Sequence, residues 1–258
     1  MMKTFKLCLC CFCILLFGCK DKSQGSAISE GSKDPADLIE KEQAKDLENA
    51  YFYILAPNGL SLRKSDDLKS EKILTIPFGA KVKQMDVLYT ADFSVENIQG
   101  SMMEVLYDGK EGYVFSGYLS RFPVLNKGEE TKDYIVKLKS IDPEVLFEEK
   151  DTDPDFHEGT VETITLPATE WHEVFYLAKA MYAVPNSLNF PGHEGVSKET
   201  INQKDREEGV WRSALEVSRN ATALDTIKYF WRGEISGYFI IITQQEKASK
   251  IEYTAFVD

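Results

Sequence analysis

The chain has no cysteine after residue 19. Its cysteines number five and all lie in the apolar N-terminal segment: Cys8, Cys10, Cys11, Cys13 and Cys19. A disulfide scaffold distributes its cysteines through the fold, so this pattern excludes one. A zinc site needs ligands that turns hold apart, and a continuous apolar run offers no such turns. The sequence therefore predicts no metal among these thiols.

Histidine is almost as scarce, with only His157, His172 and His193. No two of them have the HxH or HxxxH spacing of zinc hydrolases, and the residues after 19 contain no thiol nucleophile. A Gly-x-Ser-x-Gly elbow and a phosphate-binding loop are also absent from the sequence. The alternating acids of residues 148–158 lack the glycine and the spacing to a closing glutamate of an EF-hand, and Pro154 interrupts them, so we interpret them as a solvated loop. We predict that the protein is not an enzyme and uses no cofactor or metal.

Basic residues are fewer than acidic ones. The 258 residues include 30 Lys and Arg against 42 Asp and Glu, which gives a formal net charge of -12. A nucleic-acid-binding protein needs a basic face to neutralise phosphates. This balance argues against a nucleic-acid partner.

A membrane-spanning run is missing as well, because the longest apolar stretch at the N-terminus, residues 7–17, has eleven residues. A helix needs about 20 to cross the bilayer core. Lys3 and Lys6 precede this stretch, so residues 1–18 have the charge and length pattern of a secretory signal peptide.

The segment ends Leu16-Phe17-Gly18-Cys19, which resembles the lipobox of bacterial lipoproteins. The resemblance implies that cleavage occurs before Cys19 and that its sulfur carries a diacylglycerol, with acyl chains such as palmitate. It places the protein in the bacterial envelope, at the outer membrane or facing the periplasm. A plain signal peptide with a chance cysteine and an uncut anchor are the alternatives.

Residues 20–49 contain no aromatic residue and are rich in Ser, Gly, Lys and Glu. Low hydrophobicity with this composition is typical of disorder. We predict that residues 19–49 form a flexible, acylated tether.

Residues 50–122 predict a small all-β module. Short apolar segments at 51–55, 60–63, 73–76, 82–88, 102–107 and 112–115 alternate with turn residues. Asp108-Gly109 is a strong hairpin signal, with Gly109 at a position that needs positive φ. Five or six short strands in about seventy residues are typical of a small barrel.

The module resembles the bacterial SH3-like (SH3b) domain. The matching motifs are Leu60-Ser61-Leu62-Arg63, the segment 73–82 with Gly79, and Asp108-Gly109-Lys110-Glu111-Gly112-Tyr113-Val114 followed by Tyr118-Leu119. Residues 89–101 form a longer insertion than is usual. The resemblance implies binding of a peptide or a cell-wall component.

Four residues are candidates for ligand contact: Arg63, Tyr107, Tyr113 and Tyr118. The alternative for the tyrosines is a place in the core or along a groove wall. For Arg63 it is a surface contact with Asp66 or Asp67.

Residues 133–258 predict an α+β domain that resembles no family we can name. We expect strands at 134–138, 161–166, 210–217, 223–231, 238–244 and 250–257, the last four as an antiparallel meander. One main helix should follow Pro167, capped by Thr169, with an apolar face from Trp171 to Tyr182. The almost wholly apolar run 238–242 predicts a central strand covered on both faces.

Two functions are compatible with these features. The first is a non-catalytic, lipid-anchored envelope protein whose SH3-like module binds a peptide, peptidoglycan or another envelope protein. The second is an accessory domain protein, or an unrecognised hydrolase, that acts on cell wall through the C-terminal unit. The missing nucleophile and metal patterns favour the first.

Overall fold

A computed structural model describes residues 50–85, 92–151, 159–220, 223–245 and 248–257. The predicted signal peptide, Cys19 and the tether lie outside the described residues, as does His157. Within the described ranges the protein is mostly antiparallel β-structure, with two α-helices and one short 3-10 helix. None of the helices in these ranges is long and apolar enough to span a bilayer.

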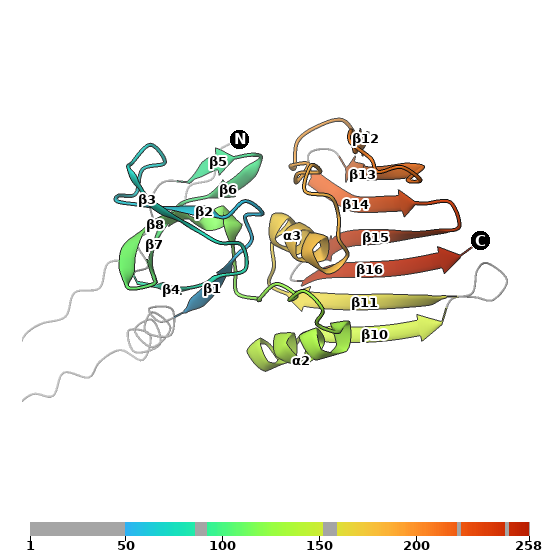
Figure 1. Cartoon of the computed structure of the whole chain (residues 1–258), viewed down its shortest axis with the longest axis horizontal. Helices are drawn as coiled ribbons and strands as arrows, with labels where there is room; N and C mark the ends of the chain where they lie inside the picture. Colours follow the sequence, from blue (N-terminus) through green and yellow to red (C-terminus); the bar gives the residue numbers. More distant parts are fainter. Residues whose placement is uncertain (1–49, 86–91, 152–158, 221–222, 246–247, 258) are drawn as a thin grey trace, which may run out of the picture.

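The first unit is a seven-stranded antiparallel sheet with the strand order β3-β2-β8-β7-β4-β1-β9, accompanied by the separate hairpin β5–β6 (Figure 1). Its elements are β1 (Tyr51–Ile54), β2 (Leu60–Arg63), β3 (Lys72–Ile76), β4 (Lys81–Gln84), β5 (Phe93–Val95), β6 (Ile98–Gly100), β7 (Met102–Tyr107), β8 (Lys110–Phe115), η1 (Ser116–Tyr118) and β9 (Leu119–Ser120).

Alternating apolar residues and tight turns explain these strands. In β2, Leu60 and Leu62 are buried, whereas Ser61 and Arg63 are only half-buried. Asp108 and Gly109 have φ of 49° and 69°, the backbone of a primed turn whose twist matches the flanking strands β7 and β8. The predicted antiparallel β-unit is confirmed. The sheet is not a closed barrel, because its edge strands β3 and β9 do not pair with each other in the described residues.

The second unit is a seven-stranded antiparallel sheet with the order β10-β11-β16-β15-β14-β13-β12. Its elements are α2 (Thr131–Ile141), β10 (Leu146–Asp151), β11 (Thr160–Pro167), α3 (Trp171–Met181), β12 (Lys198–Asn202), β13 (Arg212–Asn220), β14 (Ala223–Arg232), β15 (Ser236–Gln245) and β16 (Ala248–Val257). The predicted meander β13–β16 and the strand at 161–166 are confirmed.

The strand expected at 134–138 is wrong, because these residues belong to helix α2. Tyr134, Ile135 and Leu138 are buried, whereas Val136 between them is 68 % exposed. Burial at positions i, i+1 and i+4 is the helical period, and the apolar run was too short to reveal it. The second unit therefore has two helices rather than one main helix.

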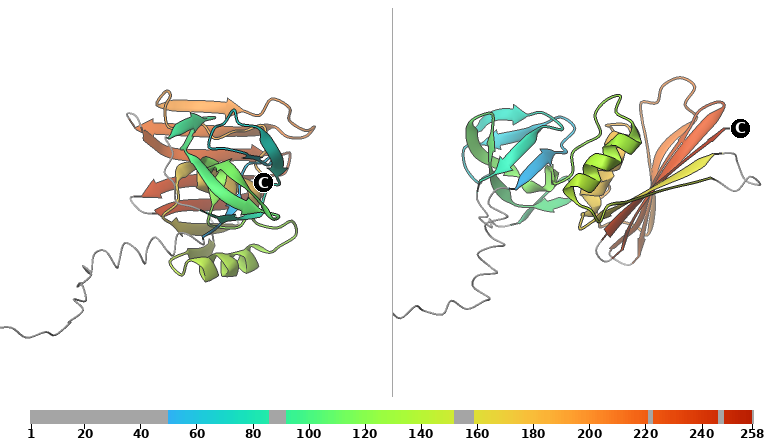
Figure 2. Two further views of the ribbon diagram at one scale, coloured as in Figure 1. Left: turned by 90° about the vertical axis from the view of Figure 1, so that its left-hand side faces the viewer. Right: turned by 90° about the horizontal axis from the view of Figure 1, so that it is seen from below.

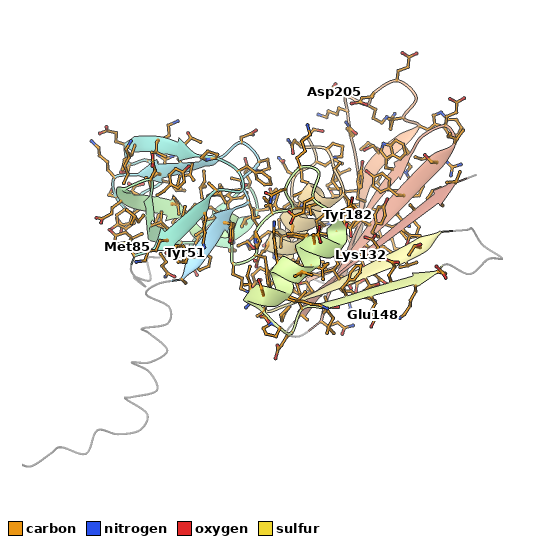
Figure 3. The ribbon with its side chains drawn as sticks, turned by 60° about the horizontal axis from the view of Figure 1, so that its bottom comes forward. Tyr51, Met85, Lys132, Glu148, Tyr182 and Asp205 are labelled. Atoms are coloured by element: carbon orange, nitrogen blue, oxygen red, sulfur yellow. The ribbon has the colours of Figure 1, made fainter. Side chains whose placement is uncertain are left out.

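Two edge strands were not predicted. The acidic segment expected as a loop from residue 148 is strand β10 as far as Asp151, and residues 152–158 lie outside the described residues. Only Phe147 of β10 is even half-buried, so the strand has no alternating apolar signal. The charges of β10, visible at Glu148 in Figure 3, are typical of edge strands that resist pairing with other chains. Strand β12 is similarly polar.

Helix α3 lies where it was predicted, but its start and its surroundings differ from the prediction. Thr169 does not cap it: Glu170 is the N-cap residue, and the Thr169 hydroxyl donates to the carbonyl of Leu166 at 3.1 Å. Eight of its eleven residues, from Trp171 to Lys179, are buried. The helix is enclosed because it lies between the sheet and the first unit (Figure 2, right).

Strand β15 is central in the sheet, as predicted, but only one of its faces is covered by helices. Ile240 and Ile242 are buried on the face toward α3, whereas Phe239 and Ile241 are half-buried on the other face. No further layer of the described chain covers that second face (Figure 2). A long cationic side chain does so instead, with the Lys228 ammonium 4.7 Å from the centre of the Phe239 ring.

Candidate functional site

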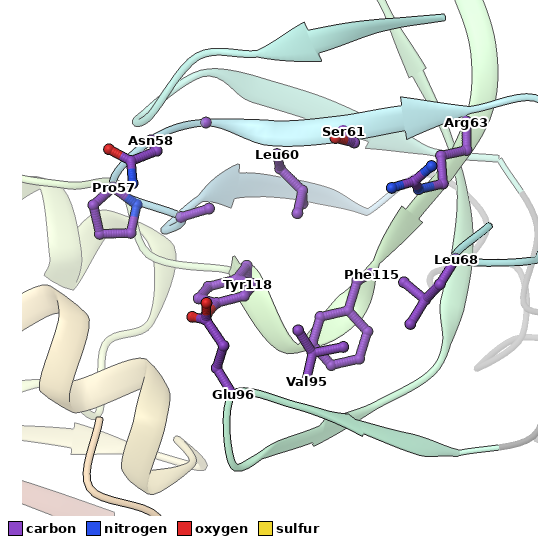
Figure 4. A pocket seen from close by; sticks show the side chains of 12 residues that line it. Pro57, Asn58, Leu60, Ser61, Arg63, Leu68, Val95, Glu96, Phe115 and Tyr118 are labelled. Atoms are coloured by element: carbon purple, nitrogen blue, oxygen red, sulfur yellow. The ribbon is translucent and has the colours of Figure 1, made fainter. Parts of the chain in front are cut away.

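The cleft in the first unit brings together the largest number of predicted site residues. It has a volume of about 250 Å³ and opens between β2 and the β5–β6 hairpin (Figure 4). Its lining combines apolar side chains with a few charged ones: Ala56, Pro57, Asn58, Gly59, Leu60, Ser61, Arg63, Leu68, Val95, Glu96, Phe115 and Tyr118. Mostly apolar walls with a few convergent polar groups are typical of small-ligand sites.

Aromatic rings build one wall of the cleft. Phe115, buried at the end of β8, stacks on Phe93 of β5 with ring centroids 5.3 Å apart. Tyr118 meets Phe115 edge-on at 6.0 Å. The described part of segment 89–101, from residue 92 on, therefore forms a hairpin that packs on the first unit and helps to form its cleft.

The turn of that hairpin places an acid at the mouth of the cleft. Glu96 and Asn97 occupy the left-handed region, with φ of 51° and 67°, between the paired residues Val95 and Ile98. Such a turn usually contains glycine, so a glutamate there is held at some conformational cost by the surrounding contacts. One such contact is the Tyr118 hydroxyl, which donates to Glu96 Oε2 at 2.6 Å. Burial raises the pKa of Tyr118, and the hydrogen bond to Glu96 raises it further.

Arg63 lies at the opposite end of the cleft from Glu96 (Figure 4). Its guanidinium donates to the carbonyl of Ser70 at 2.6 Å, and this bond ties down the polar loop that follows β2. The expected contact with Asp66 or Asp67 is not among its interactions. A cation and an acid at the two ends of one apolar cleft can recognise a ligand that carries both charges.

The four predicted contact residues separate into two pairs. Arg63 and Tyr118 line the cleft, whereas Tyr107 and Tyr113 do not. Tyr107 and Tyr113 are half-buried on β7 and β8 and pack against the core, which was the alternative interpretation. Sequence reasoning missed Glu96 and Phe115, although the length of the insertion at 89–101 was a signal that could have found Glu96.

The cleft adjoins the boundary between the two units. Tyr118 contacts Tyr176 of α3 with ring centroids 5.5 Å apart. At the same boundary, the Ser120 hydroxyl donates to the buried Glu173 carboxylate at 2.5 Å. The core is one continuous cluster across both units, so the cleft is supported from α3 as well as from its own sheet.

The structure also brings together two histidines that the sequence left apart. His172 and His193 line a cavity of about 320 Å³ with Asp92, Gln99, Gly100 and Glu170. Both imidazoles contact the ring of Phe190. Burial, together with the neighbouring His193, lowers the pKa of His172 to about 4, so His172 is neutral at pH 7. Across the described part of the chain, no group of three His, Cys, Asp or Glu side chains is arranged to hold a metal ion.

Comparison with models of known protein families, with characterised proteins and with solved structures finds no match to this chain in any of the three.

Proposed function

We propose that the protein is a lipid-anchored bacterial envelope protein whose first unit is an SH3-like module that binds a peptide without cleaving it. The anchor would be the acylated Cys19, and the tether would hold the module away from the membrane. The observation that carries the binding proposal is the cleft with Arg63 at one end, Glu96 at the other and Phe115 between them.

The shape and charge of the cleft favour a short peptide segment. Its apolar wall matches a small side chain, while Arg63 can bind a carboxylate and Glu96 an amine or a basic side chain. The left-handed turn at Glu96 and the hydrogen bond from Tyr118 hold the acid in place before a ligand arrives. Such preorganisation lowers the entropy cost of binding.

The second candidate is hydrolysis of cell wall, and the cavity with His172 and His193 is the observation that favours it. A neutral imidazole could act as a general base. Among the described residues that line this cavity there is no serine, threonine or cysteine to act as a nucleophile. We therefore rank a catalytic role below binding.

Binding can be tested with the full chain in detergent micelles on an array of tetrapeptides. Arg63→Met and Glu96→Gln should each weaken capture about tenfold, because a hydrogen bond to a charged group contributes about 1.5 kcal/mol. The exposed hairpin residues Lys110 and Glu111 supply the matched controls Lys110→Met and Glu111→Gln, which should bind as the wild type does. Equal capture by all five proteins would contradict the proposal, and release of soluble fragments from purified cell wall would favour hydrolysis.

A further inference from the structure

A second, smaller cavity lies between the two units, next to the cleft. It has a volume of about 120 Å³ and is lined by Pro57 and Phe78 of the first unit and by four residues of the second unit: Tyr176, Lys179, Ala180 and Asn186. Pro57 also lines the cleft. The rings of Tyr176 and Tyr118 touch, which joins the walls of the two cavities. The two cavities therefore adjoin at Pro57.

Among the described residues that line the cavity, Lys179 is the only charged one, and it is only 5 % exposed. Its Nζ donates to the carbonyls of Leu188 at 2.7 Å and Asn186 at 3.2 Å. Among the described residues no carboxylate lies within ion-pair distance of Nζ. An ammonium has three N–H donors, so one remains without an acceptor in the part of the chain that the structure describes.

Burying a cation without an anionic partner is costly, because the charged form loses its hydration. Burial lowers the pKa of Lys179 to about 8, so the side chain still carries its charge at pH 7. Carbonyl dipoles and the rings of Phe175 and Tyr176, 5.9 and 5.8 Å away, stabilise it only in part. An anion in the cavity would complete its coordination.

The size and charge of the cavity select the kind of anion. A single cation balances one negative charge, which a carboxylate carries and a phosphate dianion exceeds. The walls next to Lys179 are largely apolar: Pro57, Phe78 and Ala180 suit the short carbon skeleton that carries a carboxylate.

We propose that this cavity binds the free C-terminal carboxylate of the ligand, with Lys179 as its counter-ion. The inference rests on the proposed function in one respect, namely that the rest of the ligand is a peptide in the adjoining cleft. The inference adds that the peptide is recognised at its C-terminus. An internal segment of a longer chain, which has no free carboxylate, is therefore not a ligand.

The test compares two probes, N-acetyl-alanyl-alanine and its C-terminal amide, titrated into the full chain in micelles. The readout is the Cε signal of Lys179 in ¹³C-lysine-labelled protein, assigned by its loss in Lys179→Met. We expect the acid to shift this signal and the amide to bind at least about tenfold more weakly, as expected for loss of one charge-assisted contact.

Two variants separate a binding role from a structural one. Lys179→Met is close in shape and removes a buried charge that has no ion-pair partner among the described residues, so it should fold. Because this variant lacks the reporter signal, its binding is measured by isothermal titration calorimetry, and it should bind acid and amide equally. Ala180→Leu keeps the lysine but fills the cavity, and it should bind the acid weakly. Lys139→Met, at an exposed position of α2, should behave as the wild type.

The outcomes also distinguish this inference from the proposed function. Equal binding of acid and amide to the wild type, or an acid that binds without moving the Lys179 signal, would overturn the carboxylate site. If the acid moves the Lys179 signal and Arg63→Met and Glu96→Gln leave all peptide binding unchanged, the carboxylate site stands and the cleft proposal fails.

Discussion

The Ser120 hydroxyl donates to the carboxylate of Glu173, and this bond joins β9, the last strand of the first unit, to helix α3 of the second unit. Ser120 is 1 % exposed and Glu173 is 9 % exposed. Burial raises the pKa of Glu173 to about 7, despite the opposing hydrogen bond from Ser120. The boundary between the units therefore contains a carboxyl group that titrates near neutral pH.

This carboxyl group predicts a specific pH dependence of stability. Its pKa is about 7 in the fold and 4.5 in the reference state, so the folded protein binds the proton more tightly. The free energy of unfolding should therefore fall as pH rises from about 4.5 to about 7, by about 3 kcal/mol in total. Glu173→Gln should remove this fall and be more stable than the wild type at pH 8. Urea unfolding at pH values from 4 to 8 measures this pH dependence of the free energy of unfolding. The exposed Glu144→Gln is the control and should follow the wild type. Parallel pH profiles for the wild type and Glu173→Gln would contradict the prediction.

Tyr118→Phe should loosen the β5–β6 hairpin. The change removes the hydrogen bond to Glu96 but keeps the ring contacts with Phe115 and Tyr176, and it should cost about 1 kcal/mol. Hydrogen exchange of residues 93–100 should become faster. Tyr107→Phe, at a tyrosine outside the cleft, is the control. An unchanged exchange rate in Tyr118→Phe would mean that other contacts fix the turn.

Arg219→Met should be among the most destabilising single changes in the second unit. Arg219 is 5 % exposed, and its guanidinium donates to Glu199 at 2.9 Å and to the carbonyls of Pro191, Gly192 and Val196. Loss of these hydrogen bonds should lower the free energy of unfolding by about 3 kcal/mol, because Glu199 and three carbonyls lose their donor. Thermal unfolding measures the loss, with the exposed Arg206→Met as control. A melting temperature within a degree of the wild type would refute the role.

Replacing His172 and His193 together by alanine should leave peptide binding unchanged. His172 is neutral above pH 5, and neither residue lines the cleft. Loss of the contacts with Phe190 should cost about 1 kcal/mol of stability. The array used for the cleft variants measures binding, and elemental analysis measures metal in the wild type. A folded double variant without binding, or stoichiometric metal, would revive the enzymatic alternative.

Cys19→Ala should abolish incorporation of labelled palmitate and leave an uncut, longer precursor. The string Leu16-Phe17-Gly18-Cys19 motivates this expectation, and two or three acyl chains on one residue would anchor the chain firmly. Metabolic labelling measures the incorporation of palmitate, and the apparent mass of the product shows whether the signal peptide has been cleaved. Normal processing and membrane retention of the variant would exclude the lipoprotein assignment.

The sequence was sufficient for elements whose signal is local. Asp108-Gly109 sets its own turn, and alternation in β2 and in β13 sets which residues face the core. It failed where the local signal was short or absent: the five apolar residues of α2 lack a visible period, and β10 buries almost nothing. Such elements are held mainly by their neighbours, so a sequence window does not reveal them.

By itself the sequence determined the acidic character of the chain, the position of its cysteines, most of its strands and the helix after Pro167. Only the tertiary structure decided which residues meet. Glu96 reaches Tyr118 because a hairpin folds back onto the module, and Lys179 is buried because α3 is enclosed between two units. Hydrogen bonding and burial depend on distance in space, and a change of environment turns an ordinary lysine or glutamate into a group with a shifted pKa. For that reason the cleft and its neighbouring cavity arise from contacts between residues far apart in the chain.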